Sequence, residues 1–295
     1  MVTSRARMAA LIVLAVLGYM TVAGPGAVVL ELLAGFLVPV ELVPMVAQLL
    51  GETLLLAVLC RIVAVRDWWP LTGLTTPILR LRRLAAQPSG LVLLLLLMLL
   101  ILVLLDGLVV LVTRMAAGEL SAVGRAAVAH SSTAIVVIVV VETMLLVGFN
   151  EELLFRGLAL GMLLRDRGTT RGEVYRAVVT VSVLFGLAHL VHQAPLAARL
   201  ALVASTAAWG VLLAGVRLAS GSIWPGLLVH GLLDSGNKLS TLSYGDVLSP
   251  AAGSLTWSQA AAIAALLLVG VAFIESYLHG QGRRDHESQP AALST

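Results

Sequence analysis

Three short motifs place ionisable side chains one helical turn apart inside apolar stretches of the sequence. They are Glu151-Glu152-x-x-x-Arg156, Phe185-x-x-x-His189 and His230-x-x-x-Asp234. Residues four apart lie on the same face of a helix, so each motif predicts a pair of neighbouring side chains. Ionisable groups inside a bilayer are energetically costly, which makes these residues candidates for a functional site.

The acidic motif predicts one structural carboxylate and one reactive carboxylate. Glu152 and Arg156 have the spacing of an ion pair on one helix face, which would neutralise Arg156. Glu151 then points elsewhere and is available to act on water or on a metal ion. Gly157 and Gly161 follow at the small-xxx-small spacing that permits close helix approach beside the site.

The three motifs are expected at overlapping depths in the membrane. From the helical rise, Glu151 lies roughly 20 Å above the cytoplasmic end of its span, and His230 and Asp234 lie roughly 10–17 Å above the start of theirs. His189 lies about 15 residues along its own span, at a similar depth. We therefore predict one site whose catalytic residues are Glu151, Glu152, His189, His230 and Asp234, supported by Arg156 and Phe185.

Two mechanisms fit this set of side chains. In the first, His189, His230 and Asp234 bind a divalent metal ion such as zinc, and a further carboxylate deprotonates the attacking water. In the second, a Glu–His pair activates water without a metal, while the other His and a polar neighbour stabilise the oxyanion. Both mechanisms predict hydrolysis, and the sequence does not separate them.

The composition predicts an all-α protein that crosses the membrane several times. Of 295 residues, 59% are apolar and 12% are charged, and the mean hydropathy is +1.01. These values exclude an ordinary soluble enzyme, a disordered chain and a small disulfide scaffold. Cys60 is the single cysteine, so an internal disulfide and a CxxC metal site are excluded as well. Because a span needs about 20 apolar residues, we predict about eight membrane helices, at 8–24, 42–65, 90–113, 127–164, 174–192, 198–217, 223–239 and 258–278.

The basic residues predict the orientation of these helices. With the N-terminus in the cytoplasm, most Lys and Arg residues lie on the cytoplasmic side, and only Arg114, Arg125, Arg199 and Lys238 lie outside. We therefore predict a multi-pass protein of the cell membrane with both termini in the cytoplasm. The basic patches are expected to contact anionic lipid rather than nucleic acid. A cleaved signal peptide at the N-terminus is an alternative that leaves the remaining orientation unchanged.

The three motifs, in this order on three membrane helices, resemble the CPBP intramembrane proteases. That family includes the eukaryotic CAAX prenyl endopeptidase and bacterial Abi-type and bacteriocin-immunity proteins, and the resemblance covers about residues 140–240. It implies an eight-helix bundle whose site opens toward the cytoplasm. It also implies Glu151 as the water-activating base, His189 as its partner or a metal ligand, and His230 as a ligand or oxyanion stabiliser.

One residue departs from the family pattern. The last motif often ends in Asn, whose amide can donate a hydrogen bond to an oxyanion, and here the position is Asp234. An ionised Asp cannot donate. This departure favours a metal-ligand role for Asp234, or a protonated carboxyl group.

The domain organisation follows from these expectations. We predict N-terminal membrane helices over 1–125, a CPBP-like protease core over 126–240, a final membrane helix over 241–279 and a disordered cytoplasmic tail over 280–295. The Gly- and Pro-bracketed stretch 25–41 is expected to be re-entrant or interfacial. The run 127–164 is too long for one straight span, which predicts a tilt or a break near Gly148. Three further buried acids are expected to hydrogen-bond between helices or to line a polar access route: Glu52, Asp106 and Glu142.

The function predicted from these observations is an intramembrane endopeptidase that cuts a membrane-associated protein or peptide with activated water, entered from the cytoplasmic half of the bilayer. The strong preference for Arg over Lys is typical of GC-rich bacterial genes, which argues against assuming a prenylated CAAX substrate. A non-catalytic immunity or scaffold protein is the first alternative. A proton-coupled transporter is the second, although the sequence shows no inverted repeat.

Overall fold

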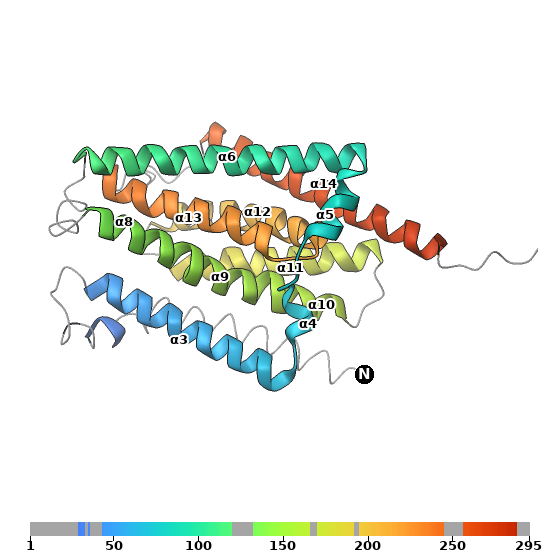
Figure 1. Ribbon diagram of the computed structural model, residues 1–295, viewed down its shortest axis with the longest axis horizontal. Coiled ribbons are helices and arrows are strands. Elements are labelled where there is room, and N and C mark those ends of the chain that lie inside the picture. The colour runs from blue at the N-terminus through green and yellow to red at the C-terminus, as the bar shows by residue number, and fades with distance from the viewer. Residues whose placement is uncertain are drawn as a thin grey trace, which may run out of the picture.

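The computed structural model describes residues 29–32, 35, 43–119, 132–165, 170–191, 195–244 and 256–287. Every regular element within these residues is a helix, as the all-α prediction requires (Figure 1). The predicted span 8–24 and most of the stretch 25–41 lie outside the described residues.

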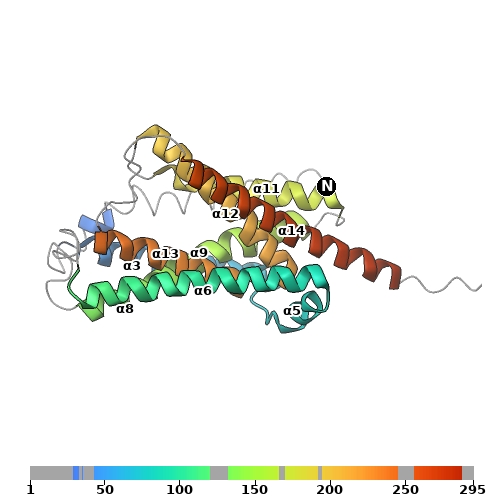
Figure 2. The same cartoon turned by 90° about the horizontal axis from the view of Figure 1, so that it is seen from above.

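The described helices run mostly along the long axis of the molecule, and consecutive long helices alternate in direction (Figures 1 and 2). Each predicted span from 42–65 to 258–278 corresponds to one helix or to one unbroken series of helical segments. The elements are α3 (Val43–Arg66), α4 (Trp69–Thr72), α5 (Ile78–Ala85), α6 (Pro88–Ala116), α8 (Ser132–Val141), η2 (Glu142–Val147), α9 (Gly148–Glu151), η3 (Glu152–Ala159), α10 (Leu160–Arg165), α11 (Arg171–Ala188), η4 (His189–Val191), α12 (Leu196–Ser220), α13 (Trp224–Tyr244) and α14 (Trp257–Glu287).

Four of the described helices are long and apolar enough to cross a membrane: Val46–Arg66, Pro88–Ala116, Leu196–Ser220 and Trp257–Gln281. Large apolar side chains also cover the outer face of α6, where Leu99, Leu102 and Val103 are all more than half exposed. An exposed apolar surface of this kind marks contact with lipid rather than water. The chain is therefore a membrane protein, and the full count of eight spans stays a prediction.

The long helix from Ser132 to Arg165 does not break near Gly148. Gly148 has ordinary helical dihedral angles, with φ −59° and ψ −40°. The helix instead contains two π-helical segments, η2 and η3, on either side of α9. Such wider turns occur frequently at functional sites. Here they place the acidic pair at the junction of α9 and η3.

Gly157 and Gly161 allow the close approach that their spacing predicts, but their partner is not another long helix. A Cβ atom at Gly157 would lie 2.9 Å from the carbonyl oxygen of Thr72, and one at Gly161 would lie 2.8 Å from that of Leu71. Both contacts are with the short helix α4. The glycines therefore let the segment between α3 and α5 pack directly against η3 and α10.

The largest buried apolar cluster joins this long helix to α11, α12 and α14. It includes Phe155 of η3, Val178 of α11, Ala214 of α12 and Ile274 of α14. α14 continues to Glu287, into the polar segment that the sequence assigned to a tail, and residues 288–295 lie outside the described part of the chain.

Candidate active site

His230 on α13 lies among the carboxylates of three acids. Its Nε2 is 3.3 Å from Oε2 of Glu151 and 3.4 Å from Oδ2 of Asp234, while its Nδ1 is 3.1 Å from Oε1 of Glu152. Only the doubly protonated ring can donate a hydrogen bond from both nitrogens. The acidic motif and the His–Asp motif, about 80 residues apart in the sequence, therefore meet on one imidazole.

His230 reaches both glutamates because α13 packs very closely against the long helix 132–165. Glu151 and Glu152 are adjacent on their helix, so their side chains point in different directions. His230 contacts both of them because its two ring nitrogens lie on opposite sides of the ring, Nε2 toward Glu151 and Nδ1 toward Glu152. The close packing depends on glycines. A Cβ atom at Gly231 would lie 2.8 Å from Cγ of Met144, and one at Gly148 would lie 3.6 Å from Cα of Gly231.

Glu152 and Arg156 form the ion pair that their spacing predicts. Nη1 of Arg156 is 2.9 Å from Oε1 of Glu152, and neither side chain is exposed at all. The guanidinium carbon also lies 4.1 Å from the centre of the Phe185 ring, in the geometry of a cation–π contact. A buried charge is stable only when it is paired in this way, so the pair secures Glu152 beside His230.

Phe185 contacts both histidines of the site. Its ring centre lies 5.0 Å from that of His189 and 5.6 Å from that of His230, each with an edge-to-face orientation. His189 begins the short helix η4, and its Nδ1 is 2.8 Å from the backbone oxygen of Phe185. If Nδ1 donates to this carbonyl, Nε2 becomes a hydrogen-bond acceptor. Phe185 therefore packs against both histidines and supports the site, as expected.

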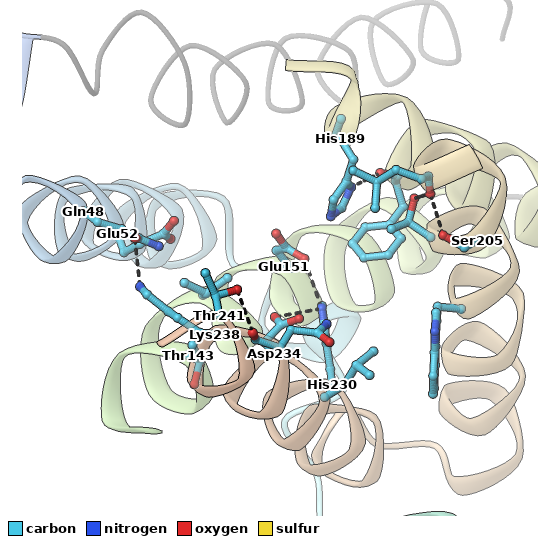
Figure 3. Close-up of a pocket in the computed structure, with 18 of the residues that line it drawn as sticks. Gln48, Glu52, Thr143, Glu151, His189, Ser205, His230, Asp234, Lys238 and Thr241 are labelled. Atoms are coloured by element: carbon cyan, nitrogen blue, oxygen red, sulfur yellow. Dashed lines mark hydrogen bonds and ion pairs between the residues drawn. The ribbon is translucent and has the colours of Figure 1, made fainter. Parts of the chain in front are cut away.

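A cavity of about 920 Å³ exposes part of this cluster (Figure 3). Glu151, His189, His230 and Asp234 line the cavity together with Phe185, whereas Glu152 and Arg156 do not. Figure 3 shows Glu151 between His189 on one side and Asp234 with His230 on the other. The structure therefore brings the predicted residues together but separates those that can touch a substrate from those that lie behind them.

A second polar group flanks the cavity, and two of its members were not predicted. Asn150 donates from Nδ2 to Oε2 of Glu52 at 2.7 Å and to the backbone oxygen of Glu52 at 2.9 Å. Nζ of Lys238 lies 2.7 Å from Oε2 of the buried Glu142. Glu52 and Glu142 thus bond between helices, as expected. The sequence offers one signal that could have identified Asn150. Its amide side chain directly precedes the acidic pair in an otherwise apolar run.

Asp106 does not follow the expectation for the buried acids. Its side chain is exposed on α6, and it has no hydrogen bond or ion pair with any residue that the structure describes. The apolar residues around it in the sequence predicted burial, but the face of α6 that carries Asp106 points outward. Its role between helices is therefore not supported.

His189, His230 and Asp234, the predicted metal ligands, are not gathered around one point in this arrangement, and metal dependence stays a prediction. Within the described ranges, no group of three or more His, Cys, Asp or Glu side chains is placed to hold a metal ion. Both ring nitrogens of His230 face carboxylate oxygens, and Nδ1 of His189 faces a backbone carbonyl. As arranged, the donor set fits a proton-bearing imidazole better than a metal ligand.

The comparison with protein families agrees with the motifs. Residues 132–236 match the family model described as type II CAAX prenyl endopeptidase, Rce1-like. This segment contains all three motifs, so the resemblance to the CPBP proteases is confirmed for it. No curated protein and no solved structure matches the chain.

Proposed function

We propose that this protein is a multi-pass intramembrane endopeptidase that hydrolyses a peptide bond in a membrane-associated protein or peptide. One observation supports this proposal above the others. Glu151, His189 and His230 come from three separate helices of the segment that matches a protease family, and all three line one cavity. Water attack within a membrane needs such a polar cavity, because the surrounding lipid supplies neither water nor a base.

Glu151 is the proposed general base. Its carboxylate takes a proton from a water molecule as the water oxygen attacks the carbonyl carbon of the scissile bond. His189 lines the same cavity, and its Nε2, as an acceptor, orients that water. The effect of a well-placed general base is typically about 10²–10⁴-fold in rate.

His230 is the proposed oxyanion stabiliser. Its Nε2–H lies at the cavity between Glu151 and Asp234, so it can donate to the oxygen that becomes negative as water attacks. When the tetrahedral intermediate collapses, the C–N bond breaks and the leaving nitrogen takes the proton from Glu151. This transfer returns Glu151 to its starting carboxylate form. The new carboxylic acid then loses its own proton, so the products are a carboxylate and an amine.

The remaining residues position these groups. Glu152 holds the Nδ1 side of His230 and is itself held by Arg156, and neither residue lines the cavity. Asp234 lies beside Nε2 and favours the protonated ring, which gives its carboxylate a role that an Asn would fill less well. The sequence allowed Glu152 a share in catalysis, and the proposed role is positioning alone.

The experiment compares cleavage by the purified wild-type protein in lipid with cleavage by two variants, each of which replaces one glutamate by the uncharged glutamine. Glu151→Gln should lower cleavage of membrane-anchored test peptides by at least about 100-fold, because the amide cannot take a proton. Glu119→Gln is the matched control, since Glu119 forms an exposed ion pair with Arg114 away from the cavity. Both variants should reach the membrane at the wild-type level.

Three outcomes would contradict the proposal. Equal cleavage by wild type and Glu151→Gln would remove Glu151 as the base. An absence of cleavage by all three proteins, with an unchanged cellular phenotype for Glu151→Gln, would support the non-catalytic immunity or scaffold alternative, and ion flux through proteoliposomes would support the transporter.

Metal dependence is tested in the same assay. A divalent metal ion such as zinc, bound by His189, His230 and Asp234, is one of the two mechanisms that the sequence allows, and the mechanism above takes no step through a metal. Assays with and without a chelator, followed by zinc addition, separate the two mechanisms. Activity that survives chelation supports the Glu–His mechanism, and activity that is lost on chelation and restored by zinc supports the metal-dependent one.

A further inference from the structure

Hydrogen bonds join the segment from α4 to α5 with the turn between α12 and α13. Ser222 donates from Oγ to the backbone oxygen of Thr75 at 2.6 Å, and the backbone N–H of Ile223 donates to the oxygen of Gly73 at 3.0 Å. Figure 1 shows α4 and α5 at one end of the described bundle. We call the two stretches together the joint, which comprises residues 68–86 and 217–224.

Two arginine side chains lie over the two glycines that end helices in the joint. Gly73 ends α4 and Gly221 ends α12, with positive φ values of 69° and 71°. A Cβ atom at Gly73 would overlap the guanidinium group of Arg217. One at Gly221 would lie 2.6 Å from Cζ of Arg80. Both guanidinium groups therefore approach bare backbone, and they lie close enough to repel each other.

No acidic side chain of the joint balances these two charges. The sequence has no Asp or Glu between residues 68 and 105, or between residues 174 and 233. Asp67, directly before the joint, is exposed. Neither Arg80 nor Arg217 forms an ion pair with any residue in the described part of the chain. The joint therefore carries an excess of positive charge.

Arg217 also leaves most of its hydrogen-bond donors unused. A guanidinium group has several N–H donors in a fixed fork. Among the described residues, the one acceptor that Arg217 reaches is the backbone oxygen of Leu71, at 3.5 Å from Nη2, which is the outer limit for a hydrogen bond. Its Nε is shielded and has no acceptor there. The carbonyl end of α12 supplies only about half an elementary negative charge, which is less than the charge of one arginine.

The surface around the joint is typical of a protein at the membrane interface. Trp69 and Trp224 are each 46% exposed, and Leu79 on α5 is 71% exposed. Trp is enriched at the level of the lipid headgroups, and an exposed Leu beside it suits contact with acyl chains. The anionic groups available to Arg80 and Arg217 at this level are the phosphates of phospholipids.

We propose that Arg80 and Arg217 bind the phosphate group of an anionic phospholipid, such as phosphatidylglycerol. A guanidinium fork matches two phosphate oxygens, and a lipid with net negative charge suits a basic joint better than a zwitterionic one. Neither arginine lines the cavity, so this binding does not depend on peptide cleavage. The lipid should stabilise the fold, because the joint includes α4, which packs against the helix 132–165.

The experiment measures thermal unfolding of the purified full-length protein in neutral detergent, before and after an addition. The additions are phosphatidylglycerol, phosphatidylcholine or inorganic phosphate at equal phosphate concentration. The variants are Arg80→Gln alone and Arg80→Gln combined with Arg217→Gln. Arg176→Gln is the matched control, because Arg176 is exposed on α11, which Figure 2 shows on the opposite side of the bundle from α5. Each variant is compared with its own unfolding temperature without lipid, so a loss of stability caused by the substitution itself does not enter.

We expect phosphatidylglycerol to raise the unfolding temperature of the wild type and of Arg176→Gln equally, since a ligand of the folded state stabilises it. Arg80→Gln should need about 10-fold more phosphatidylglycerol, or more, for half of this rise, because a hydrogen bond to a charged group is lost. The double variant should respond less still. Phosphatidylcholine and inorganic phosphate should have smaller effects on the wild type.

Several results would overturn the proposed lipid site. The response of Arg80→Gln to phosphatidylglycerol could equal that of the wild type, or Arg176→Gln could lose as much response as Arg80→Gln, which would indicate a diffuse charge effect. An equal response to inorganic phosphate would show that the joint takes a free anion rather than a lipid. An equal response to phosphatidylcholine would remove the selectivity for anionic lipid. If the double variant does not fold, the single exposed variant Arg80→Gln decides the outcome.

Discussion

His230 is the residue on which the site depends, because among the histidines that the structure describes it alone contacts all three acids of the motifs. Its two nitrogens face different environments. Nε2 lies at the cavity with Glu151 and Asp234, whereas Nδ1 faces Glu152, which Arg156 holds in place. Each residue of the acidic pair therefore has its own role, one at the substrate side of the ring and one behind it.

Because Glu152 and Arg156 lie behind the His230 ring, removing one of their charges should affect stability differently from removing both. Glu152→Gln leaves the buried Arg156 without its counter-charge and should lower the free energy of unfolding by about 3–5 kcal/mol. The double variant Glu152→Gln with Arg156→Met removes both charges and should recover most of that stability. Unfolding in detergent, followed by helical circular dichroism, measures both effects.

Cleavage assays on the same variants separate positioning from stability. The double variant should stay impaired, because Nδ1 of His230 has lost its carboxylate partner. Equal stability of Glu152→Gln and wild type would show that the pair does not support the fold. Full activity in the double variant would show that Glu152 does not position His230.

At the scale of elements, the site depends on how closely α13 packs against the helix 132–165. Gly231 and Gly148 lie at this contact, and the π-helical segments η2 and η3 flank the same stretch of helix. The Lys238–Glu142 ion pair and the Thr143–Ser235 hydrogen bond, at 2.7 and 2.6 Å, join the two helices further along. The contact therefore extends over several turns beyond His230, toward the Tyr244 end of α13.

A single added methyl group tests this contact. Gly231→Ala places a Cβ atom 2.8 Å from Cγ and 3.0 Å from Cα of Met144, so the helices must move apart. We expect a loss of cleavage of about 10-fold or more, since small displacements of reacting groups are costly. Gly236→Ala on the same helix is the control, because its Cβ would have no atom within 4 Å. Similar activities of the two variants would show that the close contact does not matter.

At the scale of the whole molecule, lipid-facing apolar surface surrounds a polar interior. The outer face of α6 consists largely of exposed Leu and Val, while Glu142, Glu152 and Arg156 are fully buried. This distribution reverses that of a soluble protein and follows from the solvent, since lipid cannot hydrogen-bond with polar groups. Asp106 is the exception, because it lies exposed on α6 about 15 Å from the Ala116 end.

Asp106 should therefore lower the stability of the protein in lipid. Replacing an acid in the apolar part of a span removes a penalty of about 2.5–3.5 kcal/mol on insertion scales. We expect Asp106→Leu to keep full cleavage and to raise the thermal stability of the protein in lipid. Glu142→Leu is the contrasting variant and should lower stability, because it removes the carboxylate that pairs with the ammonium group of Lys238. A destabilising effect of Asp106→Leu would show that this acid has a partner in the membrane.

The sequence by itself determined what depends on short separations along the chain. The Glu152–Arg156 pair and the contact of Phe185 with His189 follow from a separation of one helical turn. The helical segments from 42–65 onward follow from apolar runs, because a helix satisfies all backbone hydrogen bonds within such a run in lipid. Only the tertiary structure decided which acid faces the cavity and that both glutamates meet His230. These features depend on the rotation and crossing of helices far apart in the chain. Close contacts at glycines set that geometry, and no local pattern encodes it.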